Sequence, residues 1–429
     1  MKALVWFTQD LRTHDQVSLS KACAENQSVQ AVYCLDPSWF EYTEFGFKKT
    51  EKFRARFLLE TLTDLQQSLK KIHIPLEVVF QKPEDFISNF IQQNAINRVY
   101  KMTEWTAEEQ KVFHQVRKNT IQEVQWIQNY DQFLFHPEDI PFKTIAQLPE
   151  VFTEFRKKTE QLSRVRAALP EPKMPIENYR EPQGKIPSLT DLGFEDFETH
   201  PNSSVPFQGG QTHALNRLDH YLFETQNLSR YKQTRNGLID ADYSSKLSLW
   251  LANGSISART IYEAVQKFER TVTKTEDTYW LIFELLWRDY FKYISLKHHN
   301  KIFYLGGILS RAYSWKQNPQ KFKQWAEGKT PEPFVNANMM ELRNTGFMSN
   351  RGRQNVASFW AKQWQEDWRI GAAYFESMLI DYDVHSNYGN WIYNAGVGND
   401  PRDRMFNIKR QAEMYDPEQN FQKLWLNQS

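Results

Sequence analysis

Cysteine is nearly absent from this chain: Cys23 and Cys34 are the only two in 429 residues. Two cysteines cannot form a disulfide framework or a four-cysteine zinc site, and such scarcity is typical of a reducing compartment. No apolar run approaches the ~20 residues of a membrane-spanning helix, and charge follows Met1 too early for a signal peptide. The formal net charge is only +1, so a nucleic-acid partner would need a local basic groove. The sequence predicts a cytoplasmic protein without a membrane segment.

Aromatic residues are abundant, at 15% of the chain. Most aromatic side chains pack in a core, and others hold flat ligands or stacked bases. Hydrophobic residues make up 40% and charged residues 24%, which is an ordinary globular balance. The length gives room for about two or three domains of ~150 residues each.

Residues 1–130 alternate strand-like and helix-like patterns. A helical stretch at 54–72 carries Phe57, Leu58, Leu62, Leu65 and Leu69 on one stripe. This alternation predicts an α/β domain with a parallel, Rossmann-like sheet, although no G-x-G-x-x-G follows the first strand. The strand-like segments are ALVWF (3–7), VQAVYCLD (29–36), PLEVVF (75–80) and INRVYKM (96–102).

Two further regions follow. Ten of the 18 prolines fall between Pro137 and Pro206, and proline breaks both helices and strands, so residues 131–205 are predicted to be a long linker that wraps a surface. Residues 206–429 are predicted to form an all-α domain. Within it, residues 278–296 (TYWLIFELLWRDYFKYISL) are apolar nearly all round and predict a buried helix.

Four segments of the helical region place polar side chains among aromatic ones. In the first, Ser244, Ser245 and Ser248 accompany Lys246 near a predicted helix start, a combination that suits a phosphate; helix capping by serine is the alternative. The segments are residues 243–259, 283–291, 348–355 and 380–407.

The stretch TGFMSNRGRQNVASFW, residues 345–360, is predicted to form one helix with Asn350, Arg353 and Gln354 on one face. Buried polar groups need partners or a ligand. Together the four segments outline a pocket with hydroxyls, amides and Arg–Asp pairs, which suits a large, flat, phosphorylated cofactor. His385 is given a packing role, because a catalytic histidine needs a partner and neither cysteine is near in sequence. No metal site is expected.

These segments resemble the photolyase/cryptochrome family over essentially the whole chain, in the family's order. The opening VWFTQDLRTHD is similar to the family's first strand and loop, and TGFMSNRGRQNVASF and SNYGNW are most similar to its cryptochrome DASH branch. The resemblance implies an N-terminal α/β antenna domain and a C-terminal helical domain that holds FAD. The other matching motifs are YKQTRNGLIDADYSSKLSLWLANGSISAR, YWLIFELLWRDYF and DWRIGAAYFESMLIDYDVHSNYGNWIYNAGVGNDPRDRMFN.

The resemblance also implies a set of FAD-binding residues. Arg353 and Asp381 match an ion pair against the flavin ring, and Asn387 matches the residue that faces the flavin N5. A neutral amide there tolerates N5 with or without a proton. The implied FAD site comprises Tyr231, Ser244, Ser245, Lys246, Leu247, Ser248, Glu284, Arg288, Asn350, Arg353, Asp381, Asp383 and Asn387.

The family's reaction is the light-driven splitting of a cyclobutane pyrimidine dimer by an electron from reduced flavin. Glu284 and Asn350 match residues that hydrogen-bond the dimer. Trp391, Trp368 and Trp315 match the family's tryptophan chain for photoreduction, with core packing as the alternative. The residues that match contacts to the flipped dimer and its phosphates are Arg235, Trp287, Arg351, Gln354 and Tyr393.

Gln354 indicates whether single-stranded or duplex DNA is the expected substrate. Cryptochrome DASH proteins carry glutamine where double-strand photolyases carry methionine, and flipping a base out of a duplex costs a few kcal/mol. Apolar contact between the flipped base and an amide should offset less of that cost than contact with a thioether. Repair is therefore expected in single-stranded or looped DNA. Six-four photolyases place histidines in this pocket, which Asn350 and Gln354 do not match.

The chain also departs from the family pattern. Thr8 replaces an arginine, which weakens the case for a second, antenna chromophore. Methenyltetrahydrofolate is the candidate antenna, with Glu104 and Glu108 as its contacts or as solvated carboxylates at a helix start. The other departures, which put the geometry near the pocket in doubt, are Pro331, Asn336 and Met340.

Two functions fit the same motifs. The first is a DNA-repair enzyme, expected to be monomeric, and the second is a blue-light photoreceptor or DNA-binding regulator with little repair. An extended C-terminal tail would favour signalling, and the sequence ends soon after FQKLWLNQS, which favours repair. An unrelated α/β nucleotide-binding enzyme is the third possibility, and a flavin spectrum would exclude it.

Overall fold

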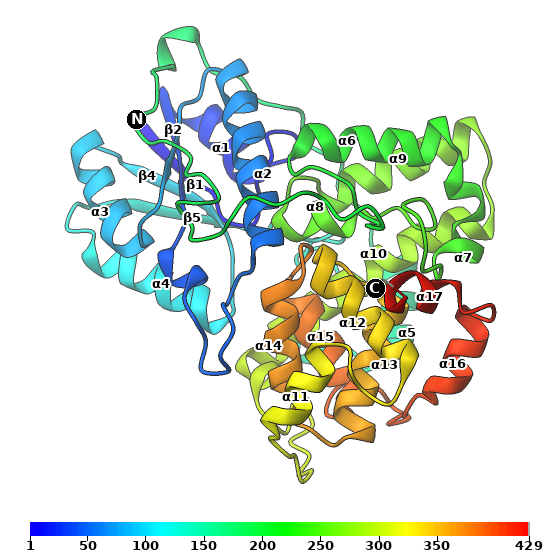
Figure 1. Cartoon of the computed structure of the whole chain (residues 1–429). Helices are drawn as coiled ribbons and strands as arrows, with labels where there is room; N and C mark the ends of the chain where they lie inside the picture. Colours follow the sequence, from blue (N-terminus) through cyan, green and yellow to red (C-terminus); the bar gives the residue numbers. More distant parts are fainter. Residues whose placement is uncertain (428–429) are drawn as a thin grey trace.

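The computed structural model describes residues 1–427; the last two positions of the predicted helical domain lie outside the described residues. Five parallel strands form one sheet in the order β3-β2-β1-β4-β5 (Figure 1), as the alternating pattern predicted. The fifth strand was not predicted, because its sequence QWIQN is only partly buried at the sheet edge. The strands are β1 (Lys2–Trp6), β2 (Ser28–Cys34), β3 (Leu76–Val79), β4 (Arg98–Met102) and β5 (Gln125–Asn129).

Helices cover both faces of this sheet. Successive strand side chains point to opposite faces, so Ala3 and Val5 of β1 pack toward α1 and α2, whereas Leu4 and Trp6 pack toward α3 and α4. The helices of the α/β layer are α1 (Val17–Glu25), α2 (Lys52–Lys71), α3 (Pro83–Asn94) and α4 (Ala107–Asn119).

The predicted apolar stripe of α2 is confirmed. Phe57, Leu62, Leu65 and Leu69 are buried, while Leu58 is half-buried. Phe57 joins the core of the helical region rather than that of the sheet, so α2 lies between the two layers.

The helical region packs around α10, which Figure 1 places behind the later helices. A capping box at Thr275 starts this helix, and nearly all of its second half is buried, as predicted. The helices of this region are α6 (Gln211–Asp219), α7 (Tyr231–Thr234), α8 (Ser248–Asn253), α9 (Ala258–Thr271), α10 (Glu276–His298), α11 (Pro319–Ala326), α12 (Pro333–Thr345), α13 (Asn350–Ser358), α14 (Trp368–Met378), α15 (Val384–Ala395), α16 (Ile408–Tyr415) and α17 (Asn420–Leu426).

The proline-rich segment 131–205 has more structure than the linker prediction allowed. It contains α5 (Phe152–Leu162), whose Phe152 and Phe155 are buried. Beyond α5 the segment runs along the α/β layer, where the Met174 backbone N–H donates to the Ile72 oxygen. The prolines therefore accompany a segment that covers the surface of the fold.

The prediction of one helix across residues 345–360 is wrong at its start. Gly346 adopts φ +70° and ends α12, since glycine has no Cβ penalty in the left-handed region. The Ser349 side chain then caps α13 by accepting a bond from the Gly352 backbone N–H at 2.9 Å. Asn350, not Thr345, is thus the first residue of the helix that carries the polar face.

A buried ion cluster joins the α/β layer to the helical region. Arg12, just after β1, binds Asp131 at 2.7 Å, and Arg259 of α9 binds Asp15 at 2.7 Å and Asp131 at 2.9 Å. Their side chains are at most 5% exposed. Against the effect of burial, the Arg259 guanidinium lowers the pKa of Asp15.

Replacing Arg259 with methionine should destabilise the protein strongly. Asp15 and Asp131 would stay buried without their shared partner, and breaking such a pair costs about 3–5 kcal/mol. The measurement is the urea dependence of tryptophan fluorescence. Lys70→Met is the control, because its pair with Glu181 is exposed and exposed ion pairs contribute little to stability. Equal losses in the two variants would contradict this account.

Candidate active site

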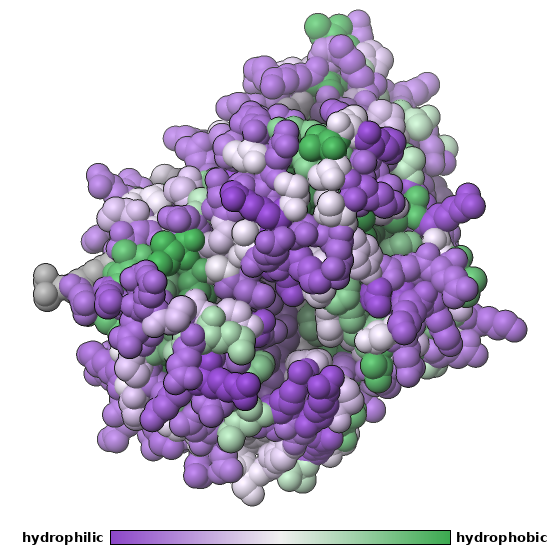
Figure 2. Space-filling model, turned by 90° about the vertical axis from the view of Figure 1, so that its right-hand side faces the viewer, coloured by the Kyte–Doolittle hydropathy of each residue, from purple (hydrophilic) through white to green (hydrophobic). Residues whose placement is uncertain are grey.

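A cavity of about 500 Å³ lies within the helical region, within the ~300–1,000 Å³ common for ligand pockets. Figure 2 shows the face that carries α7 and α16, where a hollow is bordered mainly by hydrophilic residues. The structure brings nearly all sequence-predicted site residues to this cavity. Those lining it are Tyr231, Arg235, Ser244, Ser245, Lys246, Leu247, Ser248, Glu284, Trp287, Arg288, Asn350, Arg351, Arg353, Gln354, Asp381, Asp383 and Tyr393.

The turn before α8 holds a buried cation. Lys246 has φ +60°, its Nζ lies 3.2 Å from the centroid of the Tyr243 ring, and this Nζ has no hydrogen-bond partner among the described residues. Arg217 shapes the turn by donating to the backbone oxygens of Ser244 and Ser245. Burial lowers the pKa of Lys246 well below its ordinary value. A free ammonium at the cavity wall fits a phosphate of the predicted cofactor.

The Arg353–Asp381 ion pair predicted from the sequence is present. Arg353 Nη2 donates to both carboxylate oxygens of Asp381, at 2.8 and 2.9 Å, and Arg353 Nε donates to the Met348 backbone oxygen at 2.9 Å. The Ser248 hydroxyl also donates to Asp381, at 2.7 Å. Ser248, predicted as a phosphate contact, is therefore bound to the carboxylate in this arrangement.

A second ion pair, between Lys292 and Asp383, lies beside the cavity. Asp383 caps α15 and accepts a bond from Lys292 Nζ at 2.6 Å. Burial lowers the pKa of Lys292 to about 8, and although burial opposes it, Lys292 lowers the pKa of Asp383. Arg288 donates to the backbone oxygens of Gln132 and Leu251, so it ties α10 to its neighbours.

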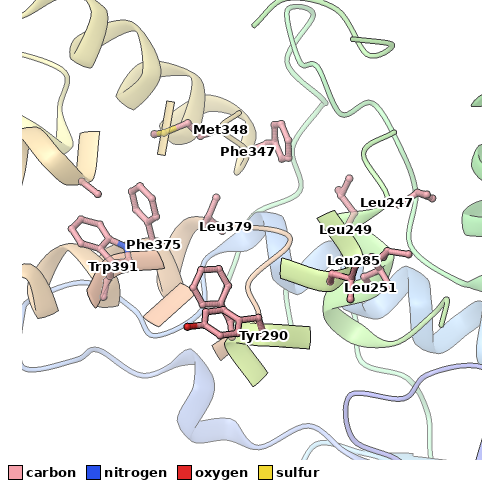
Figure 3. Close-up of a cluster of buried hydrophobic side chains, with 14 of the residues drawn as sticks. Leu247, Leu249, Leu251, Leu285, Tyr290, Phe347, Met348, Phe375, Leu379 and Trp391 are labelled. Carbon is pink, nitrogen blue, oxygen red and sulfur yellow. The ribbon is translucent and has the colours of Figure 1, made fainter. Parts of the chain in front are cut away.

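Asn387 and Trp391 lie on an adjoining cavity of about 50 Å³ that shares Arg353 and Asp381 with the larger one. Asn387 Nδ2 donates to the Ala372 backbone oxygen at 3.0 Å. Figure 3 shows Trp391 beside Phe375, with ring centroids 5.1 Å apart. The other two predicted tryptophans line neither cavity.

At the mouth of the cavity the aromatic and charged groups come together. Trp287 stacks on Phe152 at 3.7 Å and meets the Tyr393 ring edge-on at 6.1 Å. Arg235 forms an ion pair with Glu284. Burial raises the pKa of Glu284, against the lowering effect of Arg235.

Arg351 is held from three sides. Its guanidinium donates to Gln354 Oε1 at 2.9 Å and to Asn236 Oδ1 at 3.2 Å, and it lies 4.5 Å from the centroid of the Tyr415 ring. Gln354 thus faces both the cavity and a cation at its rim.

Sequence reasoning missed several groups that build the site. Arg217 and Tyr243 position the Lys246 turn, Phe152 covers Trp287, and Arg404 donates to the Tyr393 hydroxyl at 2.9 Å. Tyr243 and Arg404 stand inside quoted motifs, so their aromatic and cationic character was a usable signal. Phe152 belongs to the proline-rich segment, where no pattern indicated a contact with α10.

A second cavity, of about 410 Å³, lies beside the carboxyl ends of the strands, where open α/β sheets bind ligands. Glu108, one of the two candidate antenna contacts, lines it together with Glu109. Burial raises the pKa of Glu109 to about 7. Glu104 instead pairs with Lys101 at 3.0 Å, and Thr8 is outside the lining residues.

The departures near residue 330 form a local cluster. Asn336 Oδ1 accepts bonds from the Thr330 backbone N–H at 2.8 Å and hydroxyl at 2.7 Å, and Met340 packs beside Gly328. None of Pro331, Asn336 and Met340 is among the residues that line the larger cavity, so the doubt they raised concerns a neighbouring turn.

His385 packs as expected. Its ring stacks on Trp105 at 4.5 Å, and its Nδ1 lies 2.7 Å from the Ser295 hydroxyl. Burial lowers its pKa well below the ordinary value. Over residues 1–427, no cluster of three or more His, Cys, Asp or Glu side chains could hold a metal ion. Nor does this part of the chain have a helix long and apolar enough to cross a membrane.

Both the sequence and the fold are similar to those of known proteins. The DNA photolyase family matches residues 3–173, and the family of the FAD binding domain of DNA photolyase matches residues 280–429. The chain is 47% identical to "Cryptochrome DASH" of Gloeobacter violaceus, over 99% of this chain and 85% of that protein. It is 44% identical to "Cryptochrome DASH" of Xenopus laevis, over 97% and 81%. The crystal structure of a Synechocystis sp. PCC6803 cryptochrome has a TM-score of 0.95 and 43% identity, over 99% of this chain and 88% of that chain.

Asp381→Asn should weaken FAD binding at least about tenfold. The change removes the charge that balances Arg353, whose side chain is only 22% exposed beside the cavity, and an unpaired, partly buried cation is costly. The measurement is the flavin absorbance per mole of purified protein, followed by titration with FAD. Asp139→Asn, which loosens an exposed pair with Arg166, should keep the FAD content. Unchanged FAD affinity in Asp381→Asn would refute this role for the pair.

Glu341→Gln should change how stability depends on pH. Burial raises the pKa of Glu341 from 4.5 to about 7, so its favourable contribution is present below pH 4.5 and is lost as pH rises through about 7. Relative to the parent protein, the variant should gain stability as pH rises. Melting temperatures between about pH 5 and pH 8 measure this. The control is Glu123→Gln, at an exposed position, whose melting temperatures should follow the same pH dependence as those of the parent protein. The prediction is contradicted if Glu341→Gln also keeps the pH dependence of the parent.

Proposed function

The chain belongs to the photolyase/cryptochrome family and has cryptochrome DASH proteins as relatives, and on this premise we propose that it repairs cyclobutane pyrimidine dimers in single-stranded or looped DNA under blue light. One observation carries the proposal. A single cavity is lined by an ion pair with a buried carboxylate, by an ammonium group without a hydrogen-bond partner among the described residues, and by aromatic rings beside a partly buried carboxyl.

FAD is the cofactor of this family, and when bound it supplies the electron that light drives into the dimer. Lys246, Ser244 and Ser245 hold its phosphates. Arg353 and Asp381 lie against its ring system, and their two charges offset each other, so the ring is oriented without a net charge from this pair. The amide of Asn387, fixed by its bond to Ala372, would face the N5 edge of the bound flavin. Tyr231, Leu247, Arg288 and Asp383 complete the FAD-binding wall.

The DNA end of the cavity binds the flipped dimer. Trp287 presents one ring face, because Phe152 covers the other, and Tyr393 forms the adjoining wall. Glu284, held by its ion pair with Arg235, accepts a hydrogen bond from a pyrimidine N–H of the dimer. Asn350 lines both cavities and contacts the dimer from the flavin side.

The rim of the cavity distinguishes the form of the DNA. Arg235 and Arg351 contact phosphates beside the dimer. The Gln354 side chain is polar and is held in place by its hydrogen bond from Arg351. An apolar side chain at this position would stabilise a base that has been flipped out of a duplex, and Gln354 does so less. An unpaired dimer needs no such compensation.

The proposal also includes an electron-transfer chain and a site for an antenna chromophore. Trp391, Trp368 and Trp315 pass electrons to the flavin from outside; Trp368 is buried and Trp315 is half-buried. Methenyltetrahydrofolate is the proposed antenna in the cavity of about 410 Å³, with Glu108 as one contact.

The proposal also covers the domain boundaries, the location and the oligomeric state of the protein. The antenna domain is residues 1–130, the linker 131–205 and the FAD-binding domain 206–429. A cytoplasmic monomer is the proposed form of the protein. The second function, a blue-light photoreceptor or DNA-binding regulator, uses the same flavin site and would show dimer binding with little splitting.

Repair should be at least about tenfold faster on single-stranded than on duplex DNA, because flipping out of a duplex costs a few kcal/mol. The measurement is turnover of a thymine-dimer oligonucleotide by the photoreduced protein under blue light, with and without the complementary strand. Equal rates would refute the strand preference, and binding without turnover on either form would favour the photoreceptor.

Gln354→Met should narrow the difference between the two DNA forms. The thioether adds apolar contact for a flipped base and frees Arg351 from its amide partner, so the duplex rate should rise relative to the single-strand rate. Gln363→Met, at an exposed position outside the cavities, is the control and should keep the original ratio. An unchanged ratio in Gln354→Met would exclude this residue as the cause.

A further inference from the structure

Four tryptophan rings form a continuous series from the flavin side of the cavity toward the surface. The ring centroids are 6.3 Å apart for Trp391 and Trp325, 5.1 Å for Trp325 and Trp360, and 6.3 Å for Trp360 and Trp364. Trp391, Trp325 and Trp360 are at most 1% exposed, whereas Trp364 is half-buried. The series therefore runs from a cavity wall through the core to solvent.

The three tryptophans named by the family resemblance are less closely connected. The ring neighbour of Trp368 is Tyr388 at 6.2 Å, and that of Trp315 is Tyr313 at 5.5 Å. Across residues 1–427, no direct ring contact joins Trp391, Trp368 and Trp315 to one another. Electron tunnelling falls steeply with the distance between rings, so the direct contacts of Trp325 make it a competing neighbour of Trp391.

We propose that Trp325, Trp360 and Trp364 form a second electron-transfer route to Trp391. This inference rests on the proposed function, since the one-electron oxidant is the light-excited, oxidised flavin. Trp391 gives one electron to the flavin and becomes an indole radical cation. One electron then moves from Trp325 to Trp391, from Trp360 to Trp325 and from Trp364 to Trp360. The cation left on Trp364 releases its indole proton to water, and an added thiol returns an electron and a proton to it.

The charges around the outer rings support this direction. Glu366 and Asp367 are buried, and the Trp360 indole N–H donates to the Asp367 backbone oxygen at 2.9 Å. These carboxylates favour a positive ring nearby. Two cations oppose them. Lys321 lies 5.2 Å from the centroid of the Trp364 ring and is partly balanced by Glu366 at 3.4 Å. Arg369 pairs with Asp367 at 2.7 Å, so Glu366 and the Asp367 backbone oxygen give the main support.

Solvation favours the outer end of the series. A charge is least costly where water reaches it, so the radical cation is more stable on half-buried Trp364 than on the fully buried Trp325 and Trp360. Separation from the flavin also slows the return of the electron. The π-helical turn Phe359–Gln363 brings Trp360 and Trp364 together, with Phe359 packed on Trp364 at 4.6 Å.

The test uses the FAD-loaded protein under blue light, in two parallel samples. The rate of flavin photoreduction is measured with a thiol present. Light-dependent oxidation of individual tryptophans is measured without thiol and in air, by mass spectrometry of peptides, because a thiol would restore the tryptophan. The parent protein should show oxidation at Trp364. Trp325→Phe should abolish that oxidation, while Trp126→Phe, at a half-buried position in β5, should leave it intact.

Pairs of substitutions separate the two routes. Trp315→Phe alone should keep measurable photoreduction, and Trp315→Phe combined with Trp325→Phe should lower its rate by at least about a further tenfold. Trp364→Phe replaces a half-buried ring and tests the route without disturbing the core; combined with Trp315→Phe it should lower the rate as well. The inference is overturned if Trp364 is not oxidised in the parent, or if Trp315→Phe alone stops photoreduction as completely as Trp391→Phe.

Two further measurements on the same samples distinguish a failure of this inference from a failure of the proposed function. Flavin absorbance reports whether FAD is bound, and dimer splitting after chemical reduction with dithionite needs no tryptophan route. If splitting fails although FAD binds and Trp364 is oxidised, the repair proposal is wrong and the second route stands. If splitting succeeds while Trp364 stays unoxidised, the second route is wrong.

Discussion

The ion pair between Arg353 and the buried Asp381 is the constraint on which the functional half of the molecule depends. Asp381 draws Ser248 of α8 and Arg353 of α13 to one point. Two residues later, Asp383 caps α15 and holds Lys292 of α10. A buried carboxylate without a partner is costly, so these two acids fix the relative positions of four helices. Residues of those helices line the cavity of about 500 Å³ in which we propose that FAD binds.

Much of this arrangement could be predicted from the sequence, because its signals are local or chemical. Period-two and period-3.6 patterns give the parallel sheet and the buried α10, and polar groups in apolar surroundings indicate the pocket. The rest depends on long-range contacts. Gly346 ends α12 where the composition still reads as helix. Phe152 meets Trp287 across 135 residues of chain, and the Trp391–Trp325 contact joins two helices that share no pattern. The assignment of individual roles came from the family resemblance.

The structure also separates groups that act by position from groups that act by charge. Arg217 and Arg288 donate mainly to backbone oxygens, so they shape the walls of the cavity. Lys246 differs, because its ammonium is buried and has no hydrogen-bond partner among residues 1–427. An anion with several oxygen acceptors is the ligand that compensates such a group. Lys246 is therefore the group that we propose to bind a phosphate of the cofactor.

The most direct test of this account is a crystal structure of the protein with FAD bound. The account predicts the pyrophosphate beside Lys246 and Ser245, and the flavin ring system between Arg353 and Asn387, with the Arg353–Asp381 pair retained. FAD density confined to the cavity of about 410 Å³ beside the sheet, or a flavin ring remote from Arg353, would contradict it.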